Sequence, residues 1–377
     1  MNSKKRTFAA VLALIVLAGA VWWGTARTAP QSSGVIKIGF IGPLTGDAAP
    51  IGESTRNAVV SAIDEVNASS TQKYEVIYED GRCDGPTSAS AAQKLINIDK
   101  VKFIIGGICS GETLGAAPVA EAAHIILLSP VSSSPDITKA GDYIFRTFAS
   151  DATSGQKVAE AIWSRGYRSI AVISEQTDYA QALKDIFEAR FKELGGTIVT
   201  SEGYETTSKD FRSQLTKAKA ANPDALYLVP NTSASGQILL SQVKDMGITT
   251  PLFSNELVTT PSLLTSGVSN GVIFAEVNFD KNSPAAAAFL DAYTKRFGTM
   301  DPSSPPIYGA STYDSVHLLT DLITTYGSNP DTVKGALYAV KDRPGAAGQL
   351  TIDRNGDAVR EYVLKQVVNG QIVPVTQ

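Results

Sequence analysis

The residues best suited to bind a ligand lie at two helix starts. Ser110 and Gly111 follow the buried run KFIIGG and open a helix, and Ser133 lies two residues before Pro135, which marks the next start. Backbone N–H groups and hydroxyls at helix starts bind a carboxylate without a basic residue. Serines in these places are also common helix caps. The spacing alone leaves the cap and the ligand site equally open.

The two cysteines of the chain frame one of these starts. Cys83 lies in the loop YEDGRCDGP, and Cys109 directly precedes Ser110. Two cysteines in strand-end loops, in a chain with an apparent export segment, predict a single disulfide. That disulfide would hold the loop that presents Ser110.

Glu256 is the remaining candidate from the residues themselves. It lies in PLFSNELVTT, just after an apolar strand pattern. A loop acid at a strand end can pair with an ammonium group, although a solvated loop charge is the ordinary interpretation.

Other motifs point away from catalysis, nucleotides and metals. The glycine-rich segment 38–46 lacks the dinucleotide spacing, and Ser269 in a G-x-S-x-G match is followed, not preceded, by a strand. Segment 353–357 has a misplaced glycine for a calcium loop and predicts an Asn-Gly turn of a C-terminal strand pair. His124 and His317 have no metal-ligand spacing. We therefore expect no catalytic residue, no metal and no cofactor.

The N-terminus predicts export. The basic start MNSKKR precedes an uncharged apolar run, 7–24, which places the following chain outside the cytoplasmic membrane. Ala18-Gly19-Ala20 has the form of a cleavage site, whereas Trp22 and Trp23 resemble an interfacial anchor. Residues 1–29 are thus an export signal or a membrane anchor. Residues 30–34 form a linker, and the absence of a nearby cysteine excludes a lipid anchor.

Charge and length bound the rest. The chain has 33 basic and 37 acidic residues, and removing residues 1–27 takes away four basic ones, so the folded part has a net charge of 29 − 37 = −8. That balance gives no basic surface for nucleic acid. About 345 residues exceed what one core usually holds, so we expect two domains.

Apolar β-rich runs alternate with helical patterns twice along the chain. The first block begins with VIKIGFIG (35–42), and the second restarts after YIFRTFASD (143–151). Such alternation predicts α/β lobes with doubly wound parallel sheets, whose ligands bind beyond the carboxyl ends of the strands. Two such sheets that face each other form a cleft.

These segments, in this order, resemble the type I periplasmic binding proteins of the leucine/isoleucine/valine family. The resemblance covers nearly everything after residue 35 and rests on the opening IKIGFIGPLTGDAAPIGE, YEDGRCDGP with IIGGICSGET, ILLSPVSSSPDIT, YIFRTFASD, the helix start at Tyr179, FSNE and GQLTIDRNGD.

The resemblance implies two lobes that close on a ligand about a hinge of three crossovers. Lobe 1 would comprise residues 35–148 and 279–348, and lobe 2 residues 149–278 and 349–377. The crossovers would lie near 147–150, 276–281 and 347–352.

The resemblance also implies roles for single residues. Ser110 and Ser133, with the backbone at Val131, would hold an α-carboxylate. Tyr179 and Glu256 would approach from the second lobe, with Glu256 taking the α-ammonium. The ligand would then be an amino acid bound at both ends.

Departures from the family concern the side-chain pocket. Ile51 stands where relatives have tryptophan, and Asn231-Thr232 stand where they place a tyrosine. We expect a less aromatic, more polar pocket, with Tyr313 as a further lining candidate. The preferred side chain stays open.

The implied function is that of an extracytoplasmic substrate-binding component that delivers its ligand to an ABC permease. The alternatives are a membrane-tethered sensory receptor and a binder of another small carboxylate or amide. The N-terminal segment would contact the membrane only if it is not cleaved.

Overall fold

The computed structural model describes residues 34–375, of which residues 36–375 belong to one compact unit. The expected export segment 1–29 and all of the linker except Gly34 lie outside the described residues. Within residues 34–375, no helix combines the length and the hydropathy needed to cross a bilayer.

The first sheet has five parallel strands in the order β2-β1-β3-β4-β5. Its strands are β1 (Ile36–Gly42), β2 (Tyr74–Asp80), β3 (Phe103–Gly106), β4 (Ile126–Ser129) and β5 (Ile144–Arg146). Nearly all residues of β3, β4 and β5 are buried, as expected for parallel strands covered on both faces.

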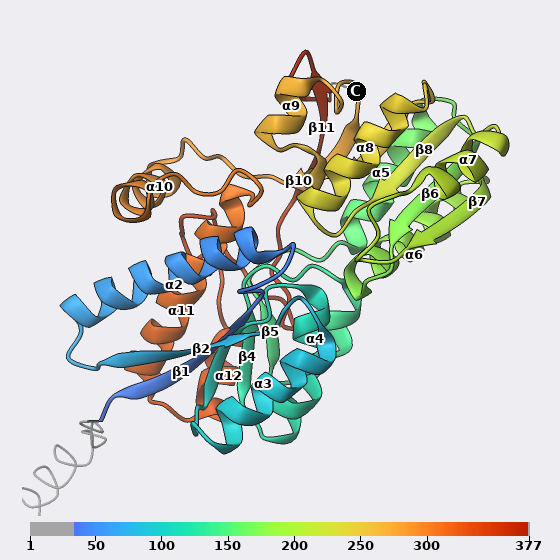
Figure 1. Cartoon of the computed structure of the whole chain (residues 1–377). Coiled ribbons are helices and arrows are strands. Elements are labelled where there is room, and N and C mark those ends of the chain that lie inside the picture. The colour runs from blue at the N-terminus through green and yellow to red at the C-terminus, as the bar shows by residue number, and fades with distance from the viewer. Residues whose placement is uncertain (1–33, 376–377) are drawn as a thin grey trace, which may run out of the picture. The chain divides into compact units, whose positions relative to one another are not determined.

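Helices cover both faces of this sheet (Figure 1). Ile38 and Phe40 of β1 face one core, and Ile41 faces the other, because successive side chains alternate across a strand. The helices packed around it are α2 (Ala49–Ser69), α3 (Gly85–Asn97), α4 (Ser110–Ala122), α10 (Pro284–Phe297), α11 (Pro306–Tyr326) and α12 (Pro330–Tyr338).

The second sheet has seven strands in the order β12-β11-β10-β9-β8-β6-β7. The first five in sequence are parallel, and β11 and β12 extend the edge antiparallel. The strands are β6 (Ser169–Glu175), β7 (Thr197–Tyr204), β8 (Ala225–Val229), β9 (Leu252–Asn255), β10 (Ile273–Val277), β11 (Tyr362–Val368) and β12 (Gln371–Pro374).

Four longer helices sandwich the second sheet. Val172 and Tyr227 pack with residues of α5 and α6, whereas Ile173 and Leu228 pack with residues of α7 and α8. The helices are α5 (Ala152–Ser164), α6 (Asp178–Glu193), α7 (Arg212–Ala220) and α8 (Ser233–Asp245), with a short α9 (Pro261–Ser266) and 3₁₀ turn η2 (Glu256–Val258). Two doubly wound sheets, as predicted, make up the unit.

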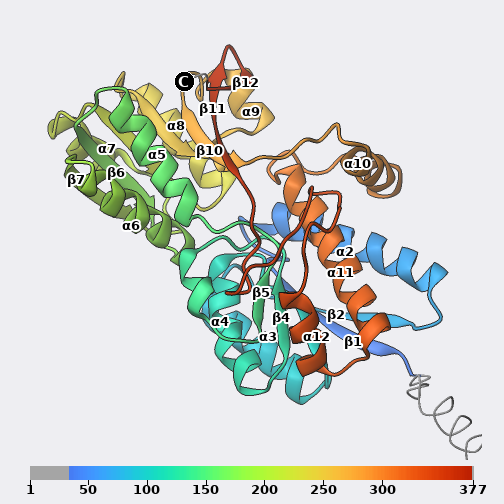
Figure 2. The same cartoon turned by 180° about the vertical axis from the view of Figure 1, so that it is seen from behind.

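Three connections join the two sheets. The first follows β5 and the second follows β10, close to the predicted positions. The third was predicted at 347–352 but lies later in the chain. Residues up to Asp357 still contact β5, because the Arg146 N–H donates to the Gly356 carbonyl and the Arg146 guanidinium pairs with Asp357 at 2.7 Å. Figure 2 shows this segment beside β5 before the chain turns to β11. The lobe boundaries stay a prediction.

One local prediction was wrong and another was right only in part. The predicted turn at 353–357 is present and is closed by an antiparallel bridge between Ile352 and Ala358, but the regular C-terminal strand pair is β11 and β12, whose turn residues Asn369 and Gly370 have positive φ. The helix expected at Pro135 is a five-residue 3₁₀ turn, η1 (Pro135–Lys139), capped by Ser134. A single 3₁₀ turn has little of the dipole that a long helix presents.

Candidate functional site

A small cavity lies where the carboxyl ends of the two sheets meet, and we call it the central site. Its volume is about 40 Å³. Both sheets contribute to its lining: Ile51, Ile108, Cys109, Ser110, Val131, Ser132, Ser133, Tyr179, Asn231, Leu257 and Tyr308. Of the residues predicted to bind ligand, Ser110, Val131, Ser133, Tyr179, Ile51 and Asn231 line it.

The predicted disulfide is present and joins the loops that follow β2 and β3. The Cα atoms of Cys83 and Cys109 lie 5.2 Å apart. Glu112 joins the same loops, because its carboxylate accepts hydrogen bonds from the N–H groups of Cys83, Ile108 and Cys109 at 2.9–3.0 Å. Burial raises the pKa of Glu112 to about 7, against the effect of these donors. The loop that presents Ser110 is thus held both by the disulfide and by the hydrogen bonds to Glu112.

Ser110 opens α4 and keeps its hydroxyl proton free for a ligand. The residue is 3 % exposed. Its Oγ accepts a hydrogen bond from the Ser134 N–H at 3.1 Å. A serine hydroxyl has one proton to donate, so Ser110 can still donate into the central site.

Ser133 is left with the opposite hydrogen-bonding capacity: its hydroxyl proton is engaged and its oxygen can accept. Its hydroxyl donates to Asp151 Oδ2 at 2.7 Å, and the Asp151 N–H donates back to the Ser133 carbonyl at 2.8 Å. With its only proton engaged, the Ser133 oxygen presents lone pairs to the central site.

Asp151 links the first connection to the last. Its Oδ1 accepts a hydrogen bond from the Tyr362 hydroxyl at 2.6 Å, at the start of β11. Burial raises the pKa of Asp151 to about 6, although its two hydroxyl donors and the charge of Arg146 oppose the rise. Asp151 therefore ties Ser133 to the strand that enters the second sheet.

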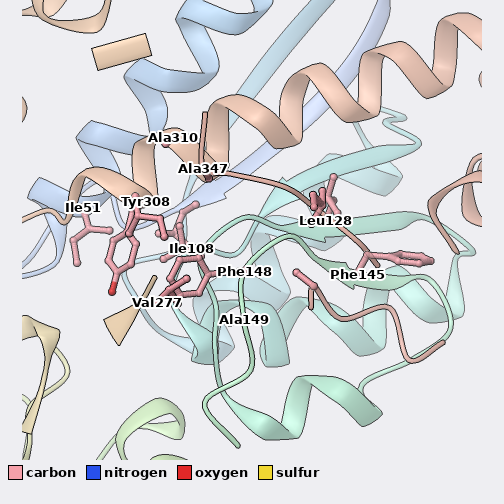
Figure 3. Packing of buried hydrophobic residues seen from close by; sticks show 14 of the residues in the cluster. Ile51, Ile108, Leu128, Phe145, Phe148, Ala149, Val277, Tyr308, Ala310 and Ala347 are labelled. Carbon is pink, nitrogen blue, oxygen red and sulfur yellow. The ribbon is translucent and has the colours of Figure 1, made fainter. Parts of the chain in front are cut away.

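Glu256 stands behind Tyr308 rather than in the wall of the central site. The Tyr308 hydroxyl donates to Glu256 Oε1 at 2.7 Å, and the Tyr308 ring packs against Phe148 at 5.5 Å between centroids. Figure 3 shows these two rings together beside Ile51. Burial and the nearby charge of Asp151 raise the pKa of Glu256 to about 7.

Tyr179 completes the second-sheet side. It lies in the first turn of α6, and its hydroxyl accepts a hydrogen bond from Asn255 Nδ2 at 3.1 Å. The hydroxyl keeps its own proton for a ligand.

Two larger cavities flank the central site. The polar chamber has a volume of about 1120 Å³ and lies between the loops near Cys83 and the strand ends near Gln176. The crossing-side chamber, of about 550 Å³, is lined by Glu256, Phe148 and the connection that follows β10. Cys109, Tyr179 and Asn231 line both the central site and the polar chamber.

The two halves of the unit contact each other across these cavities. Lys209 pairs with Asp47 at 2.6 Å, and the Ser233 hydroxyl donates to the Ser303 carbonyl at 3.1 Å. The structure therefore has loops of the first and second sheets in direct contact.

Tyr313 does not reach the central site. Its hydroxyl donates to Glu65 at 2.5 Å, and its ring contacts Phe289 and His317. Residues five apart on a helix point about 140° from each other, so Tyr308 faces the site and Tyr313 faces away.

Comparison with known proteins decides the family. The sequence profile described as periplasmic binding protein matches residues 35–371. The chain belongs to the periplasmic binding protein family.

Most of the chain is similar to other periplasmic binding proteins, both in sequence and in solved structures. A leucine-, isoleucine-, valine-, threonine- and alanine-binding protein of Pseudomonas aeruginosa is 28% identical over 337 residues, 87% of this chain and 88% of the relative. A leucine-binding protein of Thermotoga maritima superposes with a TM-score of 0.81 at 27% identity and covers 91% of this chain and 98% of that one. A solute-binding protein of Rhodopseudomonas palustris, in complex with 3,4-dihydroxybenzoic acid, gives 0.78 at 25% identity, with 90% and 96% covered. The predicted family and two-lobe fold are confirmed.

Three polar residues of this periplasmic binding protein escaped prediction from sequence. Tyr308, Asp151 and Glu112 all form hydrogen bonds that shape the site. Glu112 had a local signal, since it stands three residues after the N-cap Cys109 in a capping-box arrangement. The partners of Tyr308 and Asp151 lie far away in sequence, so no local pattern identified them.

Proposed function

We propose that this chain is the extracytoplasmic substrate-binding component of an ABC importer and that it captures an amino acid between its two lobes. The observation that supports this most directly is that Ser110 lines the central site from the first sheet, while Tyr308, which lines it too, donates to the carboxylate of Glu256 on the second sheet. Donors at one end and an acid at the other match a zwitterion.

The carboxylate half of the ligand would lie at the start of α4. Ser110 has a free hydroxyl proton, and the first N–H groups of a 13-residue helix have no partner within the helix. These donors and the helix dipole stabilise an anion without a basic side chain.

The ammonium half would lie between Ser133 and Glu256. Because the Ser133 proton is donated to Asp151, its oxygen suits an ammonium donor better than the carboxylate that the family resemblance implied. Tyr308 occupies only Oε1 of Glu256, so Oε2 is the atom we assign to the ligand.

Closure of the two lobes would deliver both halves together. In this proposal lobe 1 contains β1 to β5 with α10 to α12, lobe 2 contains the second sheet, and the three connections form the hinge. A ligand that contacts both lobes shifts the population toward the closed state. The closed protein would dock on permease subunits at the outer face of the membrane, without catalysing a reaction.

Calorimetry against the twenty amino acids tests the proposal. We expect at least one to bind, and we expect Glu256→Gln to weaken it by about 30-fold or more, since loss of one partner of a buried charged pair costs about 2–5 kcal/mol. Glu205→Gln, at an exposed loop position, is the matched control and should bind normally. Absence of any amino-acid binding, or full affinity in Glu256→Gln, would overturn the proposal.

An aromatic carboxylate is the second candidate ligand. The Rhodopseudomonas palustris relative was solved with 3,4-dihydroxybenzoic acid. Here Tyr179 and Tyr308 line the central site, and a neutral Glu256 can hydrogen-bond a phenol. Binding of hydroxybenzoates in the absence of amino-acid binding would favour this candidate.

A further inference from the structure

The polar chamber is the largest space that adjoins the central site and could hold the ligand's side chain. At about 40 Å³ the central site is too small to hold a whole amino acid, so the ligand's side chain extends beyond it. Among the larger cavities of the described residues, the polar chamber shares Cys109, Tyr179 and Asn231 with the central site, whereas a cavity of about 120 Å³ shares only Ile51 and the crossing-side chamber shares none. A side chain of any length therefore points past Asn231 into the polar chamber.

Asn231 stands at that passage with an amide that lacks strong partners. Its side-chain Nδ2 reaches only Cys83 Sγ, at 3.7 Å, and a sulfur is a weak acceptor. In contrast, the backbone of Asn231 is fixed, because its N–H donates to Glu175 Oε2 at 2.9 Å. Ser235 Oγ donates to the same Glu175 oxygen at 2.7 Å and holds that carboxylate in place. The amide is thus held in place and available to a ligand.

The walls beyond Asn231 are also polar. Arg82, Gln176, Thr206 and Lys209 contribute to the polar chamber from both halves of the unit. An aliphatic side chain would face these groups and leave the Asn231 amide unpaired, whereas a polar side chain would hydrogen-bond it. A site built to hydrogen-bond its ligand strongly rejects an analogue that lacks the polar group.

We propose that Asn231 selects amino acids whose side chains carry an amide or a hydroxyl, in preference to the branched aliphatic amino acids that several relatives are named for. This inference rests on the proposed function and specifies the substrate class of the same site. It assigns Asn231 the role of hydrogen-bonding the ligand's side chain at the entrance to the polar chamber.

Calorimetry with ligand pairs of matched shape tests the proposal. Asparagine is compared with leucine, and threonine with valine, on the wild-type protein and on Asn231→Leu. We expect the wild type to prefer the polar member of a pair by at least tenfold, and Asn231→Leu to remove or reverse that preference. Asn97→Leu, on an exposed position of α3, is the control and should keep the wild-type preference.

The outcomes separate this inference from the proposed function. Tighter binding of leucine than asparagine by the wild type, or an unchanged ratio in Asn231→Leu, would overturn the role of Asn231 while leaving amino-acid capture intact. No binding of any amino acid would overturn both. If Asn231→Leu fails to fold, Asn231→Asp provides the second test, and it should shift the preference toward lysine and arginine at constant thermal stability.

Discussion

The hydroxyl of Tyr308 donates a hydrogen bond to Glu256, and this bond joins a helix of the first sheet to a loop of the second. Phe148 supports the Tyr308 ring from the first connection between the sheets. One aromatic side chain thereby contacts the central site, the acid behind it and the hinge. Its loss should affect ligand binding more than stability.

Tyr308→Phe should weaken ligand binding about 10- to 150-fold. The variant keeps the ring and its packing but removes a hydrogen bond to a charged group, which contributes about 1.5–3 kcal/mol in the ordinary case. Calorimetry measures the affinity, and Tyr326→Phe, at an exposed position, serves as the control. Unchanged affinity would show that the bond does not contribute to closure.

Ligand binding should release protons near neutral pH. Glu256 and Asp151 have pKa values raised to about 7 and about 6, so both are partly protonated in the free protein around pH 6–7. An ammonium ion beside them favours the ionised forms and lowers both pKa values. Affinity should therefore increase as the pH rises from 5.5 to about 7.5 and then level off.

Calorimetry in buffers of different ionisation enthalpy counts the released protons. We expect a positive count at pH 6.5, a value near zero at pH 8.5, and a smaller count at pH 6.5 in Glu256→Gln. Proton uptake at pH 6.5 would contradict the expected sign.

Removal of the disulfide should destabilise the protein by about 3 kcal/mol. Cys83 and Cys109 are 26 residues apart, and closing a loop of that length restricts the unfolded chain by about this amount. The double variant Cys83→Ser, Cys109→Ser in a urea titration measures it.

The same double variant tests the positioning of Ser110. If the disulfide holds the α4 start, the affinity should fall as well as the stability, although Glu112 still joins the two loops. Unchanged affinity would mean that Glu112 alone is sufficient to hold Ser110.

Arg146→Met should destabilise the protein by about 3–5 kcal/mol. The side chain is fully buried, pairs with Asp357 and donates to the Ser134 carbonyl and to Thr138 Oγ1. Removing it leaves an uncompensated, largely buried carboxylate. The double variant Arg146→Met, Asp357→Asn should recover part of the loss in a urea titration, and no recovery would contradict the explanation.

The elements of the fold were predictable because they repeat a local pattern. The 3.6-residue period around Ala58 and Val59 and the buried run at 103–106 are each visible within one segment. The disulfide was predictable because only two cysteines were present.

Predictions failed where a contact with a residue far away in sequence determines the position or orientation of a group. Tyr313 and Tyr308 share one helix, and only the packing of α11 against α2 and the cleft determines which faces the site. The third connection lies after its predicted position because Asp357 pairs with a buried arginine 211 residues earlier in the chain.

The sequence by itself determined the two α/β lobes, the paired cysteines and the candidates Ser110 and Ser133, because strand ends and helix starts carry local signals. The family resemblance added Ile51, Val131, Tyr179 and Asn231 to the residues that line the central site. The tertiary structure alone decided whether each of these polar side chains is left to donate or to accept a hydrogen bond. Ser110 keeps its proton because Ser134 donates to it, Ser133 gives its proton to Asp151, and Asn231 lacks a strong partner. A hydroxyl or an amide can donate or accept, and only its neighbours in space settle which.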